Sequence, residues 1–362
     1  MKAYIVEREA LAENIRTLVG KANGTPIWGV LKGNGYGIGV IPFAKLLWEN
    51  GVDRFAVTEL REAELLRENY PDAPILMLRS VTDEQELQSL LNLNVILAVG
   101  SLYTAELIDR LAAQSDTVAE IHLCIDTGMG RYGFLPEDFA QLVSVYQTME
   151  HLAVSGMFTH FHSAFCSEKA TRRQFDAFCA LAQRLQKAGY ETGMLHCCNS
   201  AAFLRHPEMY LDAVRIGSAF LGRVAAGGGT ALKRIGYAEC TVEELRWLPA
   251  GHTVGYGAGF RCRERTQIAV IGIGWANGFG PERENDLHRL RDNLRALVHA
   301  IKNLFLKGDI LVTVDGKKCR ILGHIGMVHA VVDVTGENCR IGSRVVVQIN
   351  PLHVRGLKIH YR

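Results

Sequence analysis

The residue best suited to covalent chemistry is Lys32, which ends the apolar segment Trp28-Gly-Val-Leu and precedes Gly-Asn-Gly-Tyr-Gly37. Burial at the end of an apolar strand lowers the pKa of an amine and makes the amine available as a nucleophile. The glycines allow the backbone to approach a bound ligand closely. Taken alone, the segment also fits a strand that ends in a solvated lysine, so both interpretations stay open at this point.

Other polar residues follow apolar segments in the same way. Basic and hydroxyl side chains of this kind bind phosphate and carboxylate groups. His160 and His162 supply at most half of a metal site, and because no second set of ligands follows, no metal is expected. The groups are Tyr36, Asp126-Thr-Gly-Met-Gly-Arg131, Thr159-His160, Asn199-Ser200 and Arg215-Ile-Gly217-Ser218.

The elements that must position these residues form a repeating pattern from residue 25 to about residue 216. Apolar segments, each followed by a segment of helical periodicity, indicate a parallel sheet with covered faces. Eight such units favour a (β/α)8 barrel of the TIM type, an α/β fold with its chemistry at the carboxyl ends of the strands; a doubly wound open sheet is the alternative. The eight segments are Thr25–Lys32, Arg54–Thr58, Pro74–Arg79, Asn94–Val99, Ile121–Asp126, Val154–Thr159, Gly193–Cys197 and Leu211–Ile216.

A second part of the chain follows Gly227–Gly229, which has the composition of a linker. Short alternating segments separated by turns predict a smaller, mostly β domain. Segment 286–306 instead repeats its apolar residues at helical spacing and predicts an inserted helix. The sequence thus predicts a barrel over residues 1–226 and a β-rich domain over 231–362. The strands expected in the second domain are Thr241–Leu248, Gln267–Ile273, Asp309–Val314, Cys319–Leu322, Ala330–Val334 and Arg344–Ile349.

In a barrel, the polar residues that follow the strands meet at one mouth. The ends of the seventh and eighth strands are the usual phosphate position, where Ser200 and the amides of Gly217 and Ser218 would be donors. A cofactor that carries a phosphate and a reactive aldehyde bound by Lys32 accounts for the whole set. Pyridoxal 5'-phosphate is such a cofactor.

Composition excludes several classes of protein. A net charge of +2 over 362 residues gives no electrostatic case for binding nucleic acid or an anionic membrane. No apolar segment approaches the roughly 20 residues of a transmembrane helix, and the first residues lack the apolar core of a signal peptide. Nine cysteines without a C-x-x-C motif fit reduced thiols, so a cytoplasmic location is expected.

The chain resembles the alanine racemase family, pyridoxal-phosphate enzymes of fold type III, over essentially its full length. Each of the matching motifs is weak alone, but six of them in the family's order are a specific signal. They are Leu31-Lys-Gly-Asn-Gly-Tyr-Gly37, Asp126-Thr-Gly-Met-Gly-Arg-Tyr-Gly133, Phe158-Thr-His160, Asn199-Ser-Ala-Ala202, Val214-Arg-Ile-Gly217 and Val254-Gly-Tyr-Gly257.

The resemblance implies two catalytic bases. Lys32 looks like the Schiff-base lysine, which also acts on one face of the substrate. Tyr256 looks like the base on the opposite face, supplied by the partner subunit of a head-to-tail homodimer. Arg131 resembles the residue near the cofactor phenolate and the substrate carboxylate, and Met327 falls in the motif at the substrate entrance, which implies that both contact the substrate.

The resemblance also implies a set of cofactor-binding residues. Arg215 resembles the arginine that hydrogen-bonds the pyridine nitrogen and leaves it unprotonated, which suits proton exchange better than transamination. His160 is similar to the histidine that contacts the cofactor ring and pairs with that arginine. The positions that match other cofactor contacts, mostly around the phosphate, are Tyr36, Asn199, Ser200, Gly217 and Ser218.

Four departures from the family concern the substrate side of the site. Cys124 stands where many members carry a carbamylated lysine that orients the arginine here numbered 131. Asn277 replaces a carboxylate by an amide, and Val328 replaces an aspartate near the entrance. Val354 falls where the family has a phosphate-contacting tyrosine, which predicts a larger cavity.

The sequence therefore predicts an isomerase, a racemase that interconverts free L- and D-alanine. A racemase of serine or of a bulkier amino acid is an alternative, because one lost polar contact changes substrate preference by orders of magnitude. A non-catalytic pyridoxal-phosphate-binding protein is a second alternative, although the β-rich domain and Tyr256 argue against it. A decarboxylase on the same barrel is disfavoured by Arg215, and a zinc-assisted dehydratase has only Cys319 and Cys339 as candidate ligands.

Overall fold

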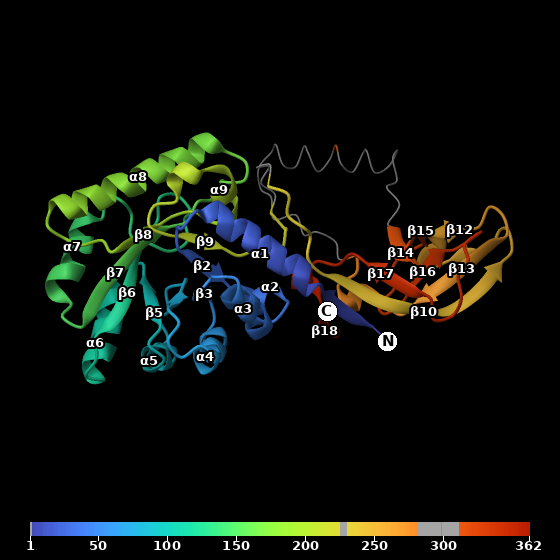
Figure 1. Cartoon of the computed structure of the whole chain (residues 1–362), viewed down its shortest axis with the longest axis horizontal. Helices are drawn as coiled ribbons and strands as arrows, with labels where there is room; N and C mark the ends of the chain where they lie inside the picture. The colour runs from blue at the N-terminus through green and yellow to red at the C-terminus, as the bar shows by residue number, and fades with distance from the viewer. Residues whose placement is uncertain (1, 225–229, 281–297, 299–310) are drawn as a thin grey trace. The chain divides into compact units, whose positions relative to one another are not determined.

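The computed structural model describes residues 2–224, 230–280, 298 and 311–362. It divides the chain into two compact units, of which one is Arg8–Ile235 and the other combines Met1–Glu7 with Gly236–Arg362 (Figure 1). This division differs from the predicted boundaries at residues 226 and 231. The N-terminal residues join the second unit because they form a strand of its sheet.

The strands of unit Arg8–Ile235 form a closed parallel ring. Their hydrogen-bonded order is β8-β7-β6-β5-β4-β3-β2-β9, and a parallel bridge between His196 and Ala213 joins the two ends. All eight strands predicted for this unit are confirmed in the described part of the chain, and the closure excludes a doubly wound open sheet. The strands are β2 (Ile27–Val30), β3 (Arg54–Val57), β4 (Ile75–Met77), β5 (Ile96–Val99), β6 (Ala119–Ile125), β7 (Leu152–Thr159), β8 (Met194–His196) and β9 (Val214–Ile216).

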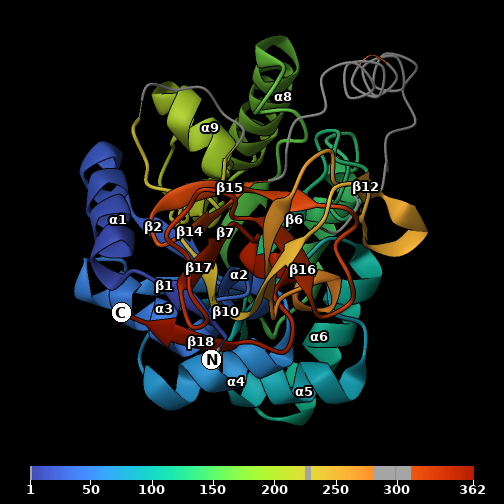
Figure 2. The same ribbon diagram turned by 90° about the vertical axis from the view of Figure 1, so that its right-hand side faces the viewer.

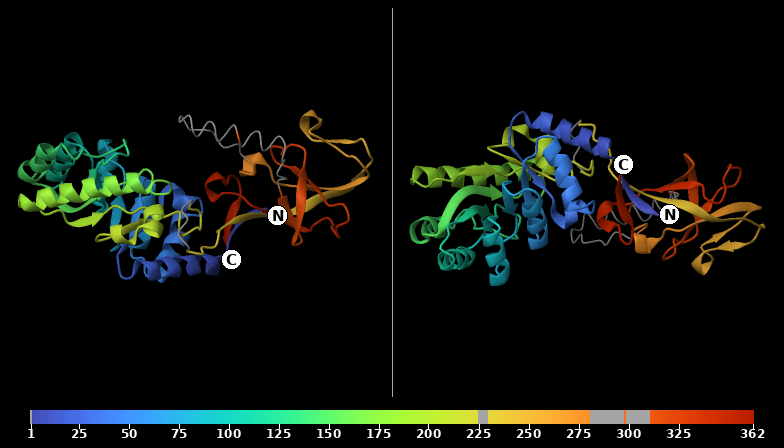
Figure 3. Two further views of the ribbon diagram at one scale, coloured as in Figure 1. Left: turned by 90° about the horizontal axis from the view of Figure 1, so that it is seen from above. Right: turned by 60° about the horizontal axis from the view of Figure 1, so that its bottom comes forward.

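Helices follow the strands and cover the outside of this ring (Figures 1 and 3). The longest is α8 (Glu168–Lys187), which buries Phe178, Leu181 and Leu185 at helical spacing, and whose N-terminus is capped by the Ser167 hydroxyl. Besides the short segment α2 (Lys32–Tyr36), the others in the described part of this unit are α1 (Arg8–Ala22), α3 (Val40–Glu49), α4 (Leu60–Asn69), α5 (Glu84–Asn92), α6 (Leu102–Gln114), α7 (Phe139–Thr148) and α9 (Ser200–Arg205).

The inside of the ring is a packed core. Trp28 is buried and contacts small and branched side chains of the neighbouring strands, and its ring also packs edge-on against His122 and at a tilt against His196. A filled interior leaves only the ends of the strands open to a ligand. The apolar members of this cluster are Trp28, Val30, Ala56, Leu76, Ile96 and Ala213.

The other unit is built mainly from antiparallel strands (Figure 2). Its long strand β10 (Tyr237–Leu248) pairs with β17 in its first half and with β13 from Val242 onward, and a bulge between Val242 and Glu244 interrupts the second pairing. The order β13-β16-β15-β14-β17-β10 therefore closes on itself. The six strands predicted for this unit are all confirmed. Besides β10, they are β13 (Thr266–Ile271), β14 (Leu311–Val314), β15 (Lys317–Leu322), β16 (Ala330–Asp333) and β17 (Arg344–Val347).

Both ends of the chain lie in this second unit. Strand β1 (Ala3–Val6), which the sequence analysis did not predict, pairs with β10 and, in parallel, with β18 (Lys358–Tyr361) (Figure 3). The predicted linker Gly227–Gly229 and, except for Val298, the predicted helix 286–306 lie outside the described residues. Within the described residues, no helix is both long and apolar enough to span a membrane.

Candidate active site

Lys32 begins an unusual turn directly after β2. In the segment α2 (Lys32–Tyr36), Gly33, Asn34, Gly35 and Tyr36 all have positive φ angles of 64°, 55°, 61° and 55°. Left-handed backbone costs an ordinary residue about 1–2 kcal/mol. The alternating glycines of Gly-Asn-Gly-Tyr-Gly therefore serve the backbone conformation. This turn brings the Tyr36 side chain against Gly217, at the end of β9.

A buried carboxylate fixes the left-handed turn. Glu62 Oε1 accepts a hydrogen bond from the Asn34 amide at 2.8 Å, and Oε2 accepts from the amides of Thr58 at 3.0 Å and Glu59 at 3.2 Å. Glu62 also completes the capping box of α4. The sequence analysis missed this residue, although a glutamate three positions after the start of a helix is a recognisable signal.

Lys32 lies between two cavities at the carboxyl ends of the strands. The first has a volume of about 380 Å³ and extends toward Tyr36 and Ser200, while the second has about 210 Å³ and extends toward Cys124 and Arg131. Burial, followed by the charges of Arg131 and Arg215, lowers the pKa of Lys32. These effects favour the neutral amine, which is the form that acts as a nucleophile or a base.

The first cavity ends in hydroxyl and amide groups suited to an oxyanion. Ser200 Oγ accepts hydrogen bonds from the amides of Gly217 at 3.0 Å and Ala219 at 3.3 Å. The Ser218 amide donates to the Tyr36 hydroxyl, and burial raises the pKa of Tyr36 to about 12, which keeps this hydroxyl protonated. A Cβ atom at position 217 would lie 2.2 Å from Tyr36 Oη, so the close approach requires glycine. Consecutive amides beside two hydroxyls form a cradle for phosphate oxygens.

Asn199 supports this cradle through its side chain. Its Oδ1 accepts hydrogen bonds from the amides of Ala201 at 3.2 Å and Ala202 at 3.1 Å, which caps α9, and its Nδ2 donates to the Phe161 carbonyl at 3.1 Å. Asn199 also lines the first cavity. Its amide therefore fixes the start of the helix that carries Ser200.

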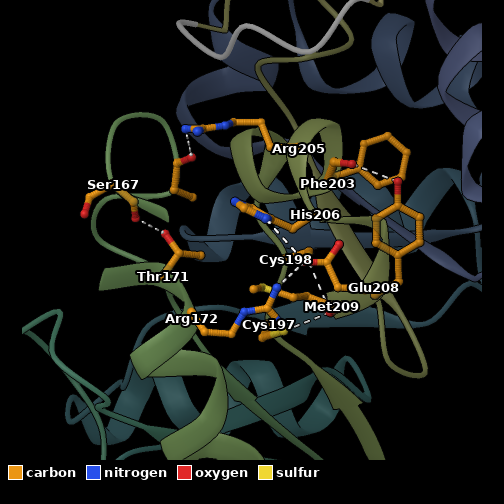
Figure 4. A network of polar contacts seen from close by, with 12 residues as sticks. Ser167, Thr171, Arg172, Cys197, Cys198, Phe203, Arg205, His206, Glu208 and Met209 are labelled. Atoms are coloured by element: carbon orange, nitrogen blue, oxygen red, sulfur yellow. Dashed lines mark hydrogen bonds and ion pairs between the residues drawn. The ribbon is translucent and has the colours of Figure 1, made fainter. Parts of the chain in front are cut away.

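Two buried thiols, Cys197 and Cys198, hold the segment between β8 and Asn199 in place. Cys197 and Cys198 both donate from Sγ to the Met209 carbonyl, at 3.1 and 3.2 Å (Figure 4). Next to Met209, Glu208 forms an ion pair with Arg172, with 2.6 Å between Oε1 and Nη2. The two thiol bonds join the backbone between β8 and α9 to Met209, and the ion pair joins Glu208 to helix α8.

Arg215 is buried and is held by acceptors that carry no formal charge. Its Nη1 donates to His196 Nδ1 at 2.6 Å and to the His196 carbonyl at 2.9 Å. Its Nη2 donates to the carbonyls of Thr159 at 2.7 Å and Cys197 at 3.3 Å. The side chain lines both cavities, so its position is fixed by the barrel while its charge acts on whatever occupies them.

Two buried histidines extend this hydrogen-bond chain into the barrel. Because an arginine only donates, His196 Nδ1 must accept, and its Nε2–H donates to His122 Nδ1 at 2.9 Å. Burial and the charge of Arg215 lower the pKa of both rings, that of His122 to about 3, so both stay neutral. The sequence analysis missed both, since a single histidine within an apolar strand has no distinguishing pattern.

His160 lies where the sequence predicts, on the walls of both cavities, but its predicted pairing with Arg215 is wrong. The described hydrogen bonds of Arg215 go to His196 and to backbone carbonyls, which surround both terminal nitrogens of the guanidinium. Burial, then the charges of Arg215 and Lys32, lower the pKa of His160 to about 3. A neutral imidazole therefore faces the ligand space.

Tyr256 and Met327 lie in the other unit. Tyr256 follows β11 (Thr253–Val254) in a short turn that returns to β12 (Phe260–Arg261), and its side chain is 80% exposed. It shares a cavity of about 480 Å³ with the exposed side chains of Met327 and Val328. The structure thus groups the predicted entrance residues with Tyr256, while the remaining predicted site residues lie together in the barrel.

The two units match one family along most of the chain. Residues 6–224 match the alanine racemase N-terminal domain, and residues 237–353 match the alanine racemase C-terminal domain. The chain belongs to the alanine racemase family. It is 32% identical over 339 residues to the alanine racemase of Desulforamulus reducens, a match that covers 91% of this chain and 84% of that protein. The alanine racemase of Symbiobacterium thermophilum is 31% identical over 348 residues, or 94% of this chain and 86% of that protein.

Solved structures agree with this assignment. The crystal structure of alanine racemase from E. faecalis has a TM-score of 0.83 and 26% identity, and the match covers 100% of this chain and 98% of that chain. Alanine racemase from Clostridium difficile 630 has a TM-score of 0.81 and 24% identity, with 99% and 88% of the chains covered. Both the barrel and the β unit therefore have the alanine racemase fold.

Cys124 departs from this family in a way that the structure explains in part. The thiol is buried, donates to the Tyr132 carbonyl at 3.6 Å, and has its pKa raised by burial to about 12, so it is neutral. Arg131 is exposed and lies over the Tyr132 ring, with its guanidinium carbon 5.5 Å from the ring centre. Cys124 therefore holds the loop backbone, and an aromatic ring holds Arg131.

The hydrogen bonds of Asn277 explain why an amide occupies this position, because both its oxygen and its nitrogen are used. Its Nδ2 donates to the Arg355 carbonyl at 3.2 Å, and its Oδ1 accepts from the Gly274 amide and from Lys2 Nζ, each at 3.4 Å. A carboxylate has no hydrogen to donate to the Arg355 carbonyl. The amide thus joins segment 274–278 to the segment that contains Val354, which is half-buried in the same unit.

A metal centre finds no support in the described residues, where no group of three or more His, Cys, Asp or Glu side chains is arranged to hold an ion. All nine cysteines are free thiols. Cys319 is buried in β15, and Cys339 is partly buried.

Proposed function

We propose that this chain is a pyridoxal-5'-phosphate-dependent racemase that interconverts L- and D-alanine by proton exchange at Cα. The observation that carries this proposal is the arrangement in the barrel mouth. A lysine of lowered pKa, an oxyanion cradle and a buried arginine whose described hydrogen bonds go to neutral acceptors border one ligand space. Membership of the alanine racemase family supports the reaction and the substrate.

The residues of the first cavity fit the cofactor. The amides of Gly217, Ser218 and Ala219 with the hydroxyls of Ser200 and Tyr36 would hold the phosphate. Lys32 would carry the cofactor covalently, and Arg215 would hold the ring nitrogen with a group that cannot give up its proton. When bound, the cofactor supplies the electron-withdrawing ring that makes the Cα proton of an amino acid acidic.

In a two-base mechanism of proton exchange with inversion, one base acts on each face of Cα. Lys32 suits one face because its amine is held neutral by burial and by neighbouring positive charges. His160, also neutral, and the fixed Arg215 would orient the ligand between them. Arg131, on the wall of the second cavity, would bind the substrate carboxylate.

Tyr256 is proposed as the second base, supplied by the partner subunit of a head-to-tail homodimer. Tyr256 is largely exposed and lines a cavity of the β unit together with the exposed Met327 and Val328. Such exposure is expected of an aromatic residue that a partner subunit covers. The free thiols are consistent with a reducing, cytoplasmic environment.

The experiment that tests this function follows deuterium at Cα. Purified, cofactor-loaded protein is incubated in D2O with L- and D-alanine, and NMR and chiral chromatography follow exchange and inversion. Exchange with inversion of alanine is expected. Inversion restricted to serine or a bulkier amino acid would favour the second candidate, which the altered Cys124 and Val328 positions support. Bound cofactor without exchange on any amino acid would contradict a racemase.

A further inference from the structure

The second cavity is lined by more arginine side chains than the α-carboxylate of one amino acid needs. It is lined by four basic side chains, Lys32, Arg79, Arg131 and Arg215, and no aspartate or glutamate is among its lining residues. Arg215 and Lys32 also border the first cavity, where the cofactor would lie. Arg79 and Arg131 belong to the second cavity alone.

Arg79 is held in place by a backbone carbonyl and a carboxylate. It follows β4, and its Nε donates to the Thr58 carbonyl at 2.6 Å while its Nη2 pairs with Glu86 of α5. Glu86 is itself fixed, because its backbone amide is bonded to the capping residue Asp83 at 2.8 Å. Neither of these two bonds uses Nη1, and the Arg79 side chain is 25% exposed. A planar donor fixed in this way is preorganised for a carboxylate.

Arg131 borders the same cavity from the loop after β6. Its guanidinium rests on the Tyr132 ring, and no carboxylate among the described residues pairs with it. The nearby Asp126 cannot compensate it by rotation, because its carboxylate already accepts from the amides of Gly128, Met129 and Gly130. Two arginines therefore border one cavity of about 210 Å³, whose lining also includes the neutral thiol of Cys124.

We propose that Arg79 and Arg131 bind the two carboxylates of an acidic amino acid, so that the second cavity admits an aspartate- or glutamate-like substrate besides alanine. An uncharged substrate side chain would displace water from Arg79 Nη1 without giving this nitrogen an acceptor. A side-chain carboxylate would instead form a charge-assisted hydrogen bond with it. The pair with Glu86 fixes the orientation of Arg79 and leaves Nη1 for the ligand. The catalytic consequence of this site rests on the proposed function, but its binding of carboxylates does not.

Binding is tested with succinate and propionate, which differ by one carboxylate, by calorimetric titration of the cofactor-loaded protein. We expect succinate to bind roughly ten- to a hundred-fold more tightly than propionate. Arg79→Met should bind the two alike, and Arg79→Lys, which keeps the charge but not the planar donor, should retain part of the difference. Equal binding of both acids by the unsubstituted protein, or an unchanged difference in Arg79→Met, would overturn the proposal.

Arg110→Met is the matched control. Arg110, in α6, donates at 2.6 Å to Glu84, which lies in α5 as Glu86 does. It lines neither cavity, so its loss removes a comparable ion pair away from the site. This variant should keep the preference for succinate. Thermal melting of all variants distinguishes loss of binding from loss of the fold.

Turnover separates this inference from the proposed function. The ratio of kcat/KM for aspartate or glutamate to that for alanine should fall at least about tenfold in Arg79→Met. An Arg79-dependent preference for succinate without racemisation of any amino acid would retain the carboxylate site and contradict the racemase. Racemisation of alanine with no preference for succinate would do the reverse.

Discussion

Two buried histidines, His122 and His160, make the stability of the barrel depend on pH. In the fold, the pKa of His122 and that of His160 are lowered from 6.5 to about 3, chiefly by burial. The unfolded chain takes up a proton at each ring below about pH 6.5, but the folded chain does not until about pH 3. Stability is therefore complete above pH 6.5 and falls as the pH drops toward 3, by up to about 1.4 kcal/mol per pH unit for each ring.

His122→Gln should remove the proton that the unfolded chain takes up at His122. The glutamine side chain keeps an acceptor for the His196 Nε2–H. Urea unfolding at fixed cofactor concentration, between pH 7 and pH 4.5, gives the slope of the unfolding free energy against pH. The slope of the variant should be smaller by about one proton. An identical slope would mean that His122 does not stay neutral in the fold.

Single residues also mark the limit of what the sequence predicts about the site. Lys32 and Arg215 were predicted because a basic residue at the end of an apolar strand is unusual, and their neighbours fix the expected position. His122, His196 and Arg79 were missed, because each is one polar residue whose partners come from other strands or helices. Only the folded barrel brings those partners together.

Tyr36 depends on the way two elements meet. The left-handed turn after β2 directs the Tyr36 ring against the end of β9, and a Cβ atom at Gly217 would lie 2.2 Å from Oη and 2.6 Å from Cζ. Gly217→Ala should therefore displace the tyrosine, lower stability by about 1–3 kcal/mol and weaken cofactor binding. Melting temperature and a pyridoxal-phosphate titration measure the two effects.

Gly20→Ala is the control for that substitution. Gly20 lies within helix α1, and an added Cβ would meet nothing within 4 Å. It should stabilise the protein by up to about 1 kcal/mol and leave cofactor binding unchanged. If Gly217→Ala behaved like Gly20→Ala, the Tyr36 ring would not be part of the cradle.

Elements differ in how far the sequence predicts them. The barrel strands are continuous apolar segments buried on both faces, so their composition identifies them. Strand β1 is equally apolar and buried, but its partners β10 and β18 come from the far end of the chain. No local pattern reports such a pairing, and for the same reason the sequence analysis assigned the N-terminal residues to the barrel.

The two proposed bases lie in different units of the molecule. Lys32 belongs to the unit Arg8–Ile235, and the exposed Tyr256 belongs to the unit that contains Gly236–Arg362. If Tyr256 serves the partner subunit, Lys32→Ala and Tyr256→Phe subunits complement each other, because their heterodimer contains one intact site. An equimolar mixture of the two impaired variants should then recover roughly a quarter of the normal activity, since half of the dimers are mixed and each has one of two sites intact.

A second mixture decides between sites shared by two subunits and sites within one. When wild-type subunits are mixed equally with subunits that carry both substitutions, a shared site leaves each mixed dimer with one defect in every site. Only wild-type homodimers then act, and activity should be roughly a quarter of that of an all-wild-type sample. Sites contained within one subunit would instead retain roughly half, because each mixed dimer would keep its wild-type site. Activity near half, together with no recovery in the first mixture, would therefore rule out Tyr256 as a base supplied by the partner.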